Sequence, residues 1–180
     1  MTRSDLTDRI MSVSAIVAAI AAVAVSAYEA RINREYQRIS VWPRVQQANT
    51  FVPGDPYQRV VSNVGVGPAL IRSVQISVDG VTRRTWGEVS KALIGKPLPG
   101  HIYSSLHAGA VVLPNKDITV LKIAPSPEAE SFWEQTQTPR LSIRICYSSL
   151  FGECWLSDSL AEQPAPVAEC RSDPAKEFQQ

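Results

Sequence analysis

The 180-residue chain lacks the patterns that mark several common classes of functional site. Its net charge is only +1, which excludes the strong positive field typical of a nucleic-acid-binding surface. No Gly-x-Ser-x-Gly motif occurs. The turn Gly65-Val66-Gly67-Pro68 has no Lys-Ser or Lys-Thr after it, and its proline lacks an N–H donor, so a phosphate-binding loop is not indicated. We therefore expect no cofactor and no nucleic-acid partner.

Histidine is equally scarce. Only His101 and His107 are present, and they flank Tyr103, Ser104 and Ser105. A serine hydrolase needs Ser, His and an acid that converge in space, and nothing in the pattern indicates that convergence. We interpret the two histidines as loop or strand-end residues and expect that the protein is not an enzyme.

The three cysteines, Cys146, Cys154 and Cys170, all lie in the last quarter of the chain. Their spacing matches no zinc motif, so we expect no metal site. One disulfide with one free thiol, in an oxidising compartment, is the interpretation we adopt. The spacing leaves the pairing open. Because Cys146 and Cys154 flank a predicted hairpin loop, a cysteine-dependent redox protein or enzyme remains the alternative.

What the sequence does contain is a long uncharged run, Ile10 to Tyr28, bounded by Arg9 and Glu29. Nineteen residues at about 1.5 Å per residue span roughly the 30 Å hydrocarbon core of a bilayer. The run predicts a single transmembrane helix that acts as an uncleaved signal anchor. The alternative is cleavage after Ala27, which would release a secreted soluble domain.

The orientation of this helix follows from the flanking residues. Arginines are fewer before the span than after it, which by count alone would place the main domain in the cytoplasm. The short N-terminal tail, its free amino group and the cysteines favour the opposite arrangement. We expect the N-terminus inside and the main domain outside.

Two faces of the predicted helix offer contacts. Small residues four apart, Ser14, Ala18, Ala22 and Ser26, favour close packing against a membrane helix of a second copy or of another protein. An Ala-rich span also produces this spacing by chance.

Beyond the span the helical pattern continues to residue 41 and carries the juxtamembrane arginines Arg31, Arg34 and Arg38. These side chains are placed to meet lipid headgroups, or else they belong to a solvated stalk.

The remaining chain predicts one β-rich domain. Alternating apolar residues indicate short strands near 58–64, 70–79, 81–83, 102–106, 110–113, 118–123, 141–147 and 154–157. A capping box at Thr85 and a Ser-Pro start at Ser126 predict two short connecting helices. The pattern is typical of an immunoglobulin-like β-sandwich. We divide the chain into an N-terminal tail (1–9), a membrane and juxtamembrane helix (10–41), the sandwich (42–160) and a flexible C-terminal tail (161–180), which is held only if Cys170 is bridged.

Three segments resemble a group of uncharacterised bacterial single-pass membrane proteins. They are Ser40-Val41-Trp42-Pro43, Asn63-Val64-Gly65-Val66-Gly67-Pro68-Ala69, and Cys146-Tyr147-Ser148-Ser149-Leu150-Phe151-Gly152-Glu153-Cys154-Trp155. Those proteins often carry a further cysteine near the position of Ser148, which this chain lacks. The resemblance implies an N-terminal anchor and a β-rich domain, without a known activity.

Taken with the anchor, these features predict a protein of the bacterial inner membrane whose main domain lies in the periplasm. The bilayer is its first expected partner, followed by a membrane protein or a second copy. We expect a non-enzymatic protein-binding or assembly module.

Overall fold

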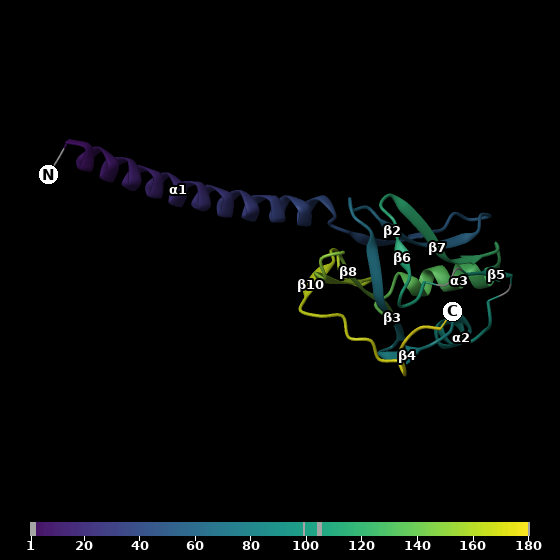
Figure 1. Ribbon diagram of the computed structural model, residues 1–180. Coiled ribbons are helices and arrows are strands. Elements are labelled where there is room, and N and C mark those ends of the chain that lie inside the picture. Colours follow the sequence, from purple (N-terminus) through teal and green to yellow (C-terminus); the bar gives the residue numbers. More distant parts are fainter. Residues whose placement is uncertain (1–2, 99, 104–105, 180) are drawn as a thin grey trace. The chain divides into compact units, whose positions relative to one another are not determined.

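The computed structural model describes residues 3–98, 100–103 and 106–179, with side chains from residue 10 onward. The chain forms two compact units, Met1–Ser40 and Val41–Gln180, and Figure 1 shows the elements of each.

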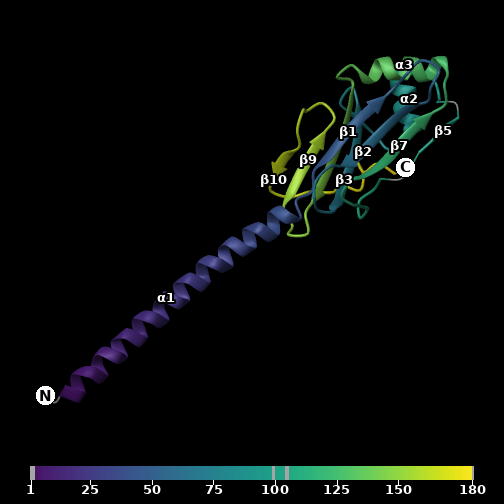
Figure 2. The same cartoon turned by 90° about the horizontal axis from the view of Figure 1, so that it is seen from above.

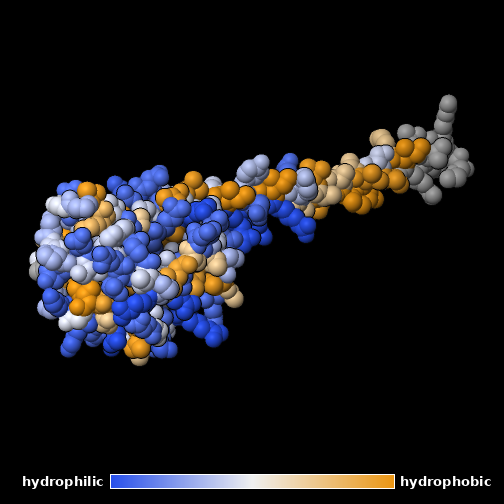
Figure 3. All heavy atoms as spheres, turned by 180° about the vertical axis from the view of Figure 1, so that it is seen from behind, coloured by the Kyte–Doolittle hydropathy of each residue, from blue (hydrophilic) through white to orange (hydrophobic). Residues whose placement is uncertain are grey.

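The first unit is one helix, α1 (Arg3–Ser40). From Ile10 it is long and apolar enough to cross a membrane, a property that a signal sequence shares. Figure 3 shows exposed apolar side chains along the part of the helix that is drawn in colour. The helix starts at Arg3 and so includes residues 3–9 of the expected N-terminal tail.

The second unit is rich in β-structure. In the part of it that the structure describes, ten strands and two helices follow one another: β1 (Val45–Thr50), β2 (Tyr57–Asn63), β3 (Ala69–Val78), β4 (Val81–Arg83), α2 (Trp86–Ile94), β5 (His101–Ile102), β6 (Val111–Val112), β7 (Lys116–Ile123), α3 (Pro127–Thr136), β8 (Leu141–Ser148), β9 (Cys154–Asp158) and β10 (Ala165–Val167). The predicted strand at 102–106 overlaps β5, and its residues 104–105 lie outside the described residues.

The strands form two antiparallel sheets, visible in Figure 2. One has the order β1-β2-β7-β5 and the other β10-β9-β8-β3-β4, with β6 also paired to β3. Both sheets bury side chains in one hydrophobic core, including Val61 and Leu121 from the first and Ile76, Ile145 and Tyr147 from the second. The side chain of Gln47, on β1, also reaches across to the carbonyl of Ile143 on β8 at 3.1 Å.

Local signals in the sequence are confirmed where they are strongest. Asp79-Gly80 makes the turn between β3 and β4, and both residues have positive φ. The N-cap Thr85 accepts a hydrogen bond from the backbone N–H of Glu88 at 3.2 Å, and α2 ends at Gly95 in the left-handed conformation.

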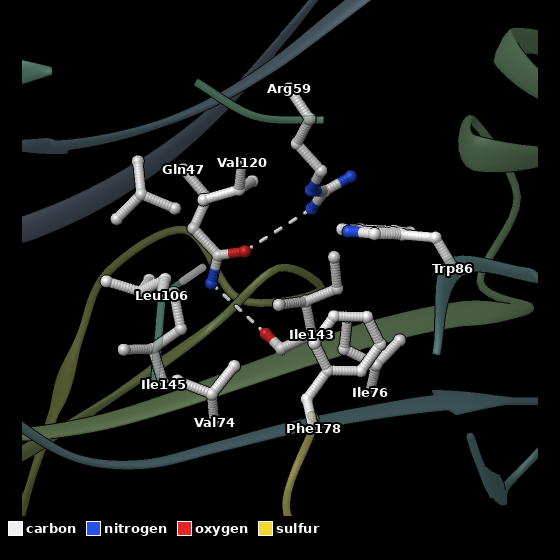
Figure 4. Close-up of a pocket in the computed structure, with 11 residues that line it drawn as sticks. Gln47, Arg59, Val74, Ile76, Trp86, Leu106, Val120, Ile143, Ile145 and Phe178 are labelled. Atoms are coloured by element: carbon white, nitrogen blue, oxygen red, sulfur yellow. Dashed lines mark hydrogen bonds between the residues drawn. The ribbon is translucent and has the colours of Figure 1, made fainter. Parts of the chain in front are cut away.

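Strand β1 was not predicted, because its inward side is largely polar. Gln47 and Asn49 accept hydrogen bonds from the buried guanidinium of Arg59 at 3.3 and 2.8 Å. Figure 4 shows the Gln47 amide between Arg59 and the carbonyl of Ile143. A strand that buries amides to satisfy a cation has no apolar alternation in its sequence.

The C-terminal segment also differs from the prediction. Instead of a flexible tail from residue 161, the chain adds β10 to β9, bridges Cys170 to β8 and buries Phe178, which is 5% exposed. We expected the tail to be held to the domain only if Cys170 is bridged, and the bridge is present. The burial of Phe178 was not predicted, because the surrounding segment is rich in proline and charge.

Candidate functional site: an apolar rim at one end of the domain

Large apolar side chains are exposed on three loops, and on the short strand β6 with the residue after it, at the end of the domain where β2 and β8 finish and β3 begins. We call this set the apolar rim. Its members are between 40% and 63% exposed: Trp42, Val64, Val66, Val111, Leu113, Leu150 and Phe151. Exposed apolar residues gathered on loops, rather than scattered singly, are typical of interaction surfaces.

Asn63, which is fully buried, joins two of these loops and β6. Its side-chain oxygen accepts hydrogen bonds from the backbone N–H groups of Arg44 and Gly65 at 3.1 and 3.0 Å. Its side-chain nitrogen donates to the carbonyls of Gly67 and Val112 at 2.8 and 2.9 Å. Every hydrogen-bonding direction of one amide is therefore used to hold the loops that carry the rim.

Two glycines bring the rim loops against the chain that enters the domain. The backbone N–H groups of Val66 and Gly67 both donate to the carbonyl of Trp42, at 3.0 and 3.2 Å. A Cβ added to Gly67 would lie 1.8 Å from the carbonyl oxygen of Val41, and one added to Gly65 would lie 2.4 Å from the backbone nitrogen of Arg44. Only glycine permits this approach, which explains the Gly-x-Gly pattern without a phosphate.

The hairpin between β8 and β9 presents the other aromatic member. The N–H of Ser149 donates to the carbonyl of Glu153 at 2.9 Å, and the N–H of Phe151 donates to the Ser149 hydroxyl at 3.1 Å. Gly152 turns the chain with a φ of 82°. Since these bonds occupy the backbone, the turn leaves Leu150 and Phe151 at its outer side.

One arginine and a pair of stacked aromatic rings lie near the rim. The guanidinium of Arg44 lies 5.9 Å from the centre of the Trp42 ring, within the range of a cation–π contact. Beneath the hairpin, Tyr147 stacks on Trp155 with ring centres 5.8 Å apart, and burial raises the pKa of the Tyr147 hydroxyl. Stacked rings under the hairpin support its exposed tip.

Two of the three cysteines form a disulfide and the third is a free thiol. Cys146 and Cys170 form a disulfide with their Cα atoms 5.6 Å apart, and Cys154 is free and partly exposed. Cys146 pairs with Leu156 and Ser148 with Cys154 across β8 and β9, so the free thiol and the disulfide share one face of the sheet.

Each of the two histidines contacts a nearby backbone carbonyl. The Nδ1 atom of His101 lies 2.9 Å from the carbonyl of Leu98, and that of His107 lies 2.8 Å from the carbonyl of Ala108. Ser104 and Ser105 lie outside the described residues. Among the residues that are described, no group of His, Cys, Asp and Glu is arranged to hold a metal ion.

The predicted contact residues of the membrane helix all lie on α1. Ser14, Ala18, Ala22 and Ser26 are exposed, and the Ser14 hydroxyl donates to the carbonyl of Ile10 at 2.6 Å within the helix. Arg31, Arg34 and Arg38 are exposed on the part of α1 that follows the uncharged run.

Asn63, the residue that organises the rim, was not predicted as a site residue. The available signal was its position at the end of a strand, directly before a Gly-x-Gly-Pro turn, where a buried amide can satisfy the backbone groups of a tight loop.

Comparison of the chain with protein-family models, with curated proteins and with solved structures finds no match. The function must therefore be argued from the site itself.

Proposed function

We propose that this protein is a single-pass membrane-anchored module that binds another protein through the apolar rim. In this proposal its two-sheet domain is an immunoglobulin-like β-sandwich in the bacterial periplasm, and it performs no catalysis. The observation that carries the proposal is the set of exposed apolar side chains on loops held together by Asn63. A fixed apolar surface loses little conformational entropy when a partner covers it.

In this proposal the arginines of α1 lie beyond the hydrocarbon of the bilayer. If the bilayer ends near Tyr28, the helical residues to Ser40 rise about 18 Å further, whereas a headgroup layer is only about 5–8 Å thick. The exposed arginines of α1 lie in this interval.

The disulfide supports the proposed compartment. Cys146–Cys170 belongs in an oxidising space, which in a bacterium is the periplasm rather than the cytosol. Digestion of a C-terminal tag in cells with a permeabilised outer membrane, together with a mobility shift on reduction, is the expected result. Protection of the tag would reverse the orientation, and N-terminal sequencing that starts at Tyr28 would establish the secreted form.

The binding proposal is tested by placing a photo-crosslinking amino acid at Val66 or Phe151 in the full-length protein in its membrane. The matched control is Val81, a valine of similar exposure after the turn at the opposite end of β3. We expect a defined crosslinked species from the two rim positions and none from Val81.

The crosslinked species also identifies the partner by mass. A partner that forms the same adduct when Leu150 and Phe151 are changed to Ser, or crosslinks that are equal at Val66 and Val81, would contradict a role for the rim.

A second candidate function, thiol chemistry, is favoured by the position of Cys154 beside the disulfide on one sheet face. Its thiolate would attack one sulfur of the Cys146–Cys170 bond, form a new disulfide with that sulfur and release the other cysteine as a thiolate. Mapping the disulfides by mass spectrometry after incubation at pH 8 tests this. A single, unchanged Cys146–Cys170 bridge would exclude it.

A further inference from the structure

One edge of β3 lacks a neighbouring strand over part of its length. On this edge β6 pairs with Ala69 and Leu70, and β4 pairs with the strand from Ile76 onward. No strand among the described residues pairs with the intervening segment, 72–75, on this side. An open backbone edge of this kind is a template for an added chain.

The C-terminal segment occupies that edge through Glu177 and Phe178. The carboxylate of Glu177 accepts hydrogen bonds from the hydroxyl of Ser73 at 2.6 Å and from the N–H of Val74 at 2.9 Å. The N–H of Phe178 donates to the carbonyl of Val74 at 2.8 Å. Next in the chain, the N–H of Gln179 donates to the carbonyl of Arg84, the residue after β4, at 2.9 Å.

The ring of Phe178 enters the space between the sheets. It meets Trp86 edge to face with ring centres 5.1 Å apart. Figure 4 shows it beside Ile76 and Ile143, in a pocket that also reaches Arg59. With the ring in place the remaining cavity is about 20 Å³, room for about one water molecule. We call the edge of β3 at Ser73 and Val74, together with this pocket, the tail cleft.

The tail contacts the cleft through one carboxylate, one aromatic ring and the backbone N–H of Phe178. Two further bonds join it to Arg84, through the N–H of Gln179 and the carbonyl of Pro174, while residues 174–176 are exposed. Residues 174–179 belong to no strand of either sheet. The tail can therefore leave without breaking a ladder between strands, and a partner segment would have to replace the Phe178 ring that leaves the core.

We propose that the tail cleft is a binding site for an extended segment of a partner protein in which an acidic residue precedes an aromatic one. The tail of the chain is a tethered competitor that imitates this segment. The disulfide at Cys170 keeps the competitor close, and short flexible tethers give effective concentrations of about 1 mM. A partner segment binds when its affinity and concentration together exceed those of the tethered tail. This site is separate from the apolar rim and does not depend on the function proposed for the rim.

The test uses the full-length protein and a fluorescent peptide that copies residues 172–180. Glu177→Gln combined with Phe178→Ala in the protein releases the cleft. We expect the peptide to bind this variant at least tenfold more tightly than the wild type. A control peptide with the same two substitutions should bind neither protein.

Equal binding to variant and wild type, or equal binding of both peptides, would overturn the proposal. Concentration-dependent dimers of the wild type that disappear with Phe178→Ala would also overturn it, because they would assign the cleft to the tail of a second copy.

Hydrogen exchange on the wild type keeps the proposal testable if the variant does not fold. The backbone amides of Val74, Phe178 and Gln179 should exchange faster than those in the β3–β8 ladder, because the tail opens locally. If all exchange together, only through global unfolding, the tail is a fixed part of the core and the proposal fails.

Discussion

Asn63 offers the sharpest test of how the domain builds its exposed rim. Asn63→Ala removes four hydrogen bonds and leaves two N–H groups and two carbonyls without that partner. An orphaned buried polar group costs about 1–3 kcal/mol, but loops at a surface relax and admit water. We therefore expect a loss of about 3–5 kcal/mol in the free energy of unfolding, a large fraction of the 5–15 kcal/mol typical of a domain.

Urea unfolding of the domain measures this loss. With a slope of about 2 kcal/mol per molar urea, the midpoint should fall by roughly 1.5–2.5 M. Gln46→Ala, an exposed amide on β1, is the matched control and should change the free energy of unfolding by less than about 0.5 kcal/mol.

Asn63→Asp separates the two halves of the amide. It keeps the acceptor for Arg44 and Gly65 but loses the donor to Gly67 and Val112, and it places a carboxylate against two carbonyls. Burial and these carbonyls raise the pKa of the new group. The variant should therefore be less stable at pH 7 than at mildly acid pH, relative to wild type.

A loss below about 1 kcal/mol for Asn63→Ala, with crosslinking at the rim unchanged, would refute the claim that this amide holds the loops.

Three further substitutions test the packing, the charge pairing and the cysteine chemistry of the domain. Gly67→Ala should lower the free energy of unfolding by several kcal/mol or prevent folding, because its Cβ would overlap backbone atoms. Gly87→Ala is the control: its Cβ would meet only a side-chain atom at 3.9 Å, so thermal melts should show it to be neutral or stabilising. Arg140 lowers the pKa of Asp79 through a hydrogen bond, so that pair stabilises the domain above the ordinary aspartate pKa and the contribution disappears as the pH falls through the lowered value. Asp79→Asn, which keeps the turn, should accordingly be less stable than wild type at pH 7 and equal to it in strong acid; a constant difference would contradict the pairing. Thiol titration of the unfolded, unreduced chain should give one thiol, and Cys154→Ser should remove it without changing the mobility shift on reduction.

The structural elements that the sequence predicted are those whose cause is local. The uncharged run from Ile10 makes α1 apolar whatever surrounds it. Thr85, Gly95 and the Asp79-Gly80 turn act on backbone groups within a few residues, so their patterns can be read directly. The helix starts and hairpins of the domain followed from such signals.

What the tertiary structure alone decided depends on groups distant in the chain. Strand β1 has a polar inward side because it meets Arg59, and the disulfide partner of Cys146 lies 24 residues away with a free cysteine nearer in sequence. Asn63 is important because strands bring Val112 to it, and Phe178 is buried because β3 leaves an open edge beside Trp86. In each case a polar or isolated residue is stabilised by a partner that only the folded sheets supply. A local pattern of hydrophobicity carries no record of that partner.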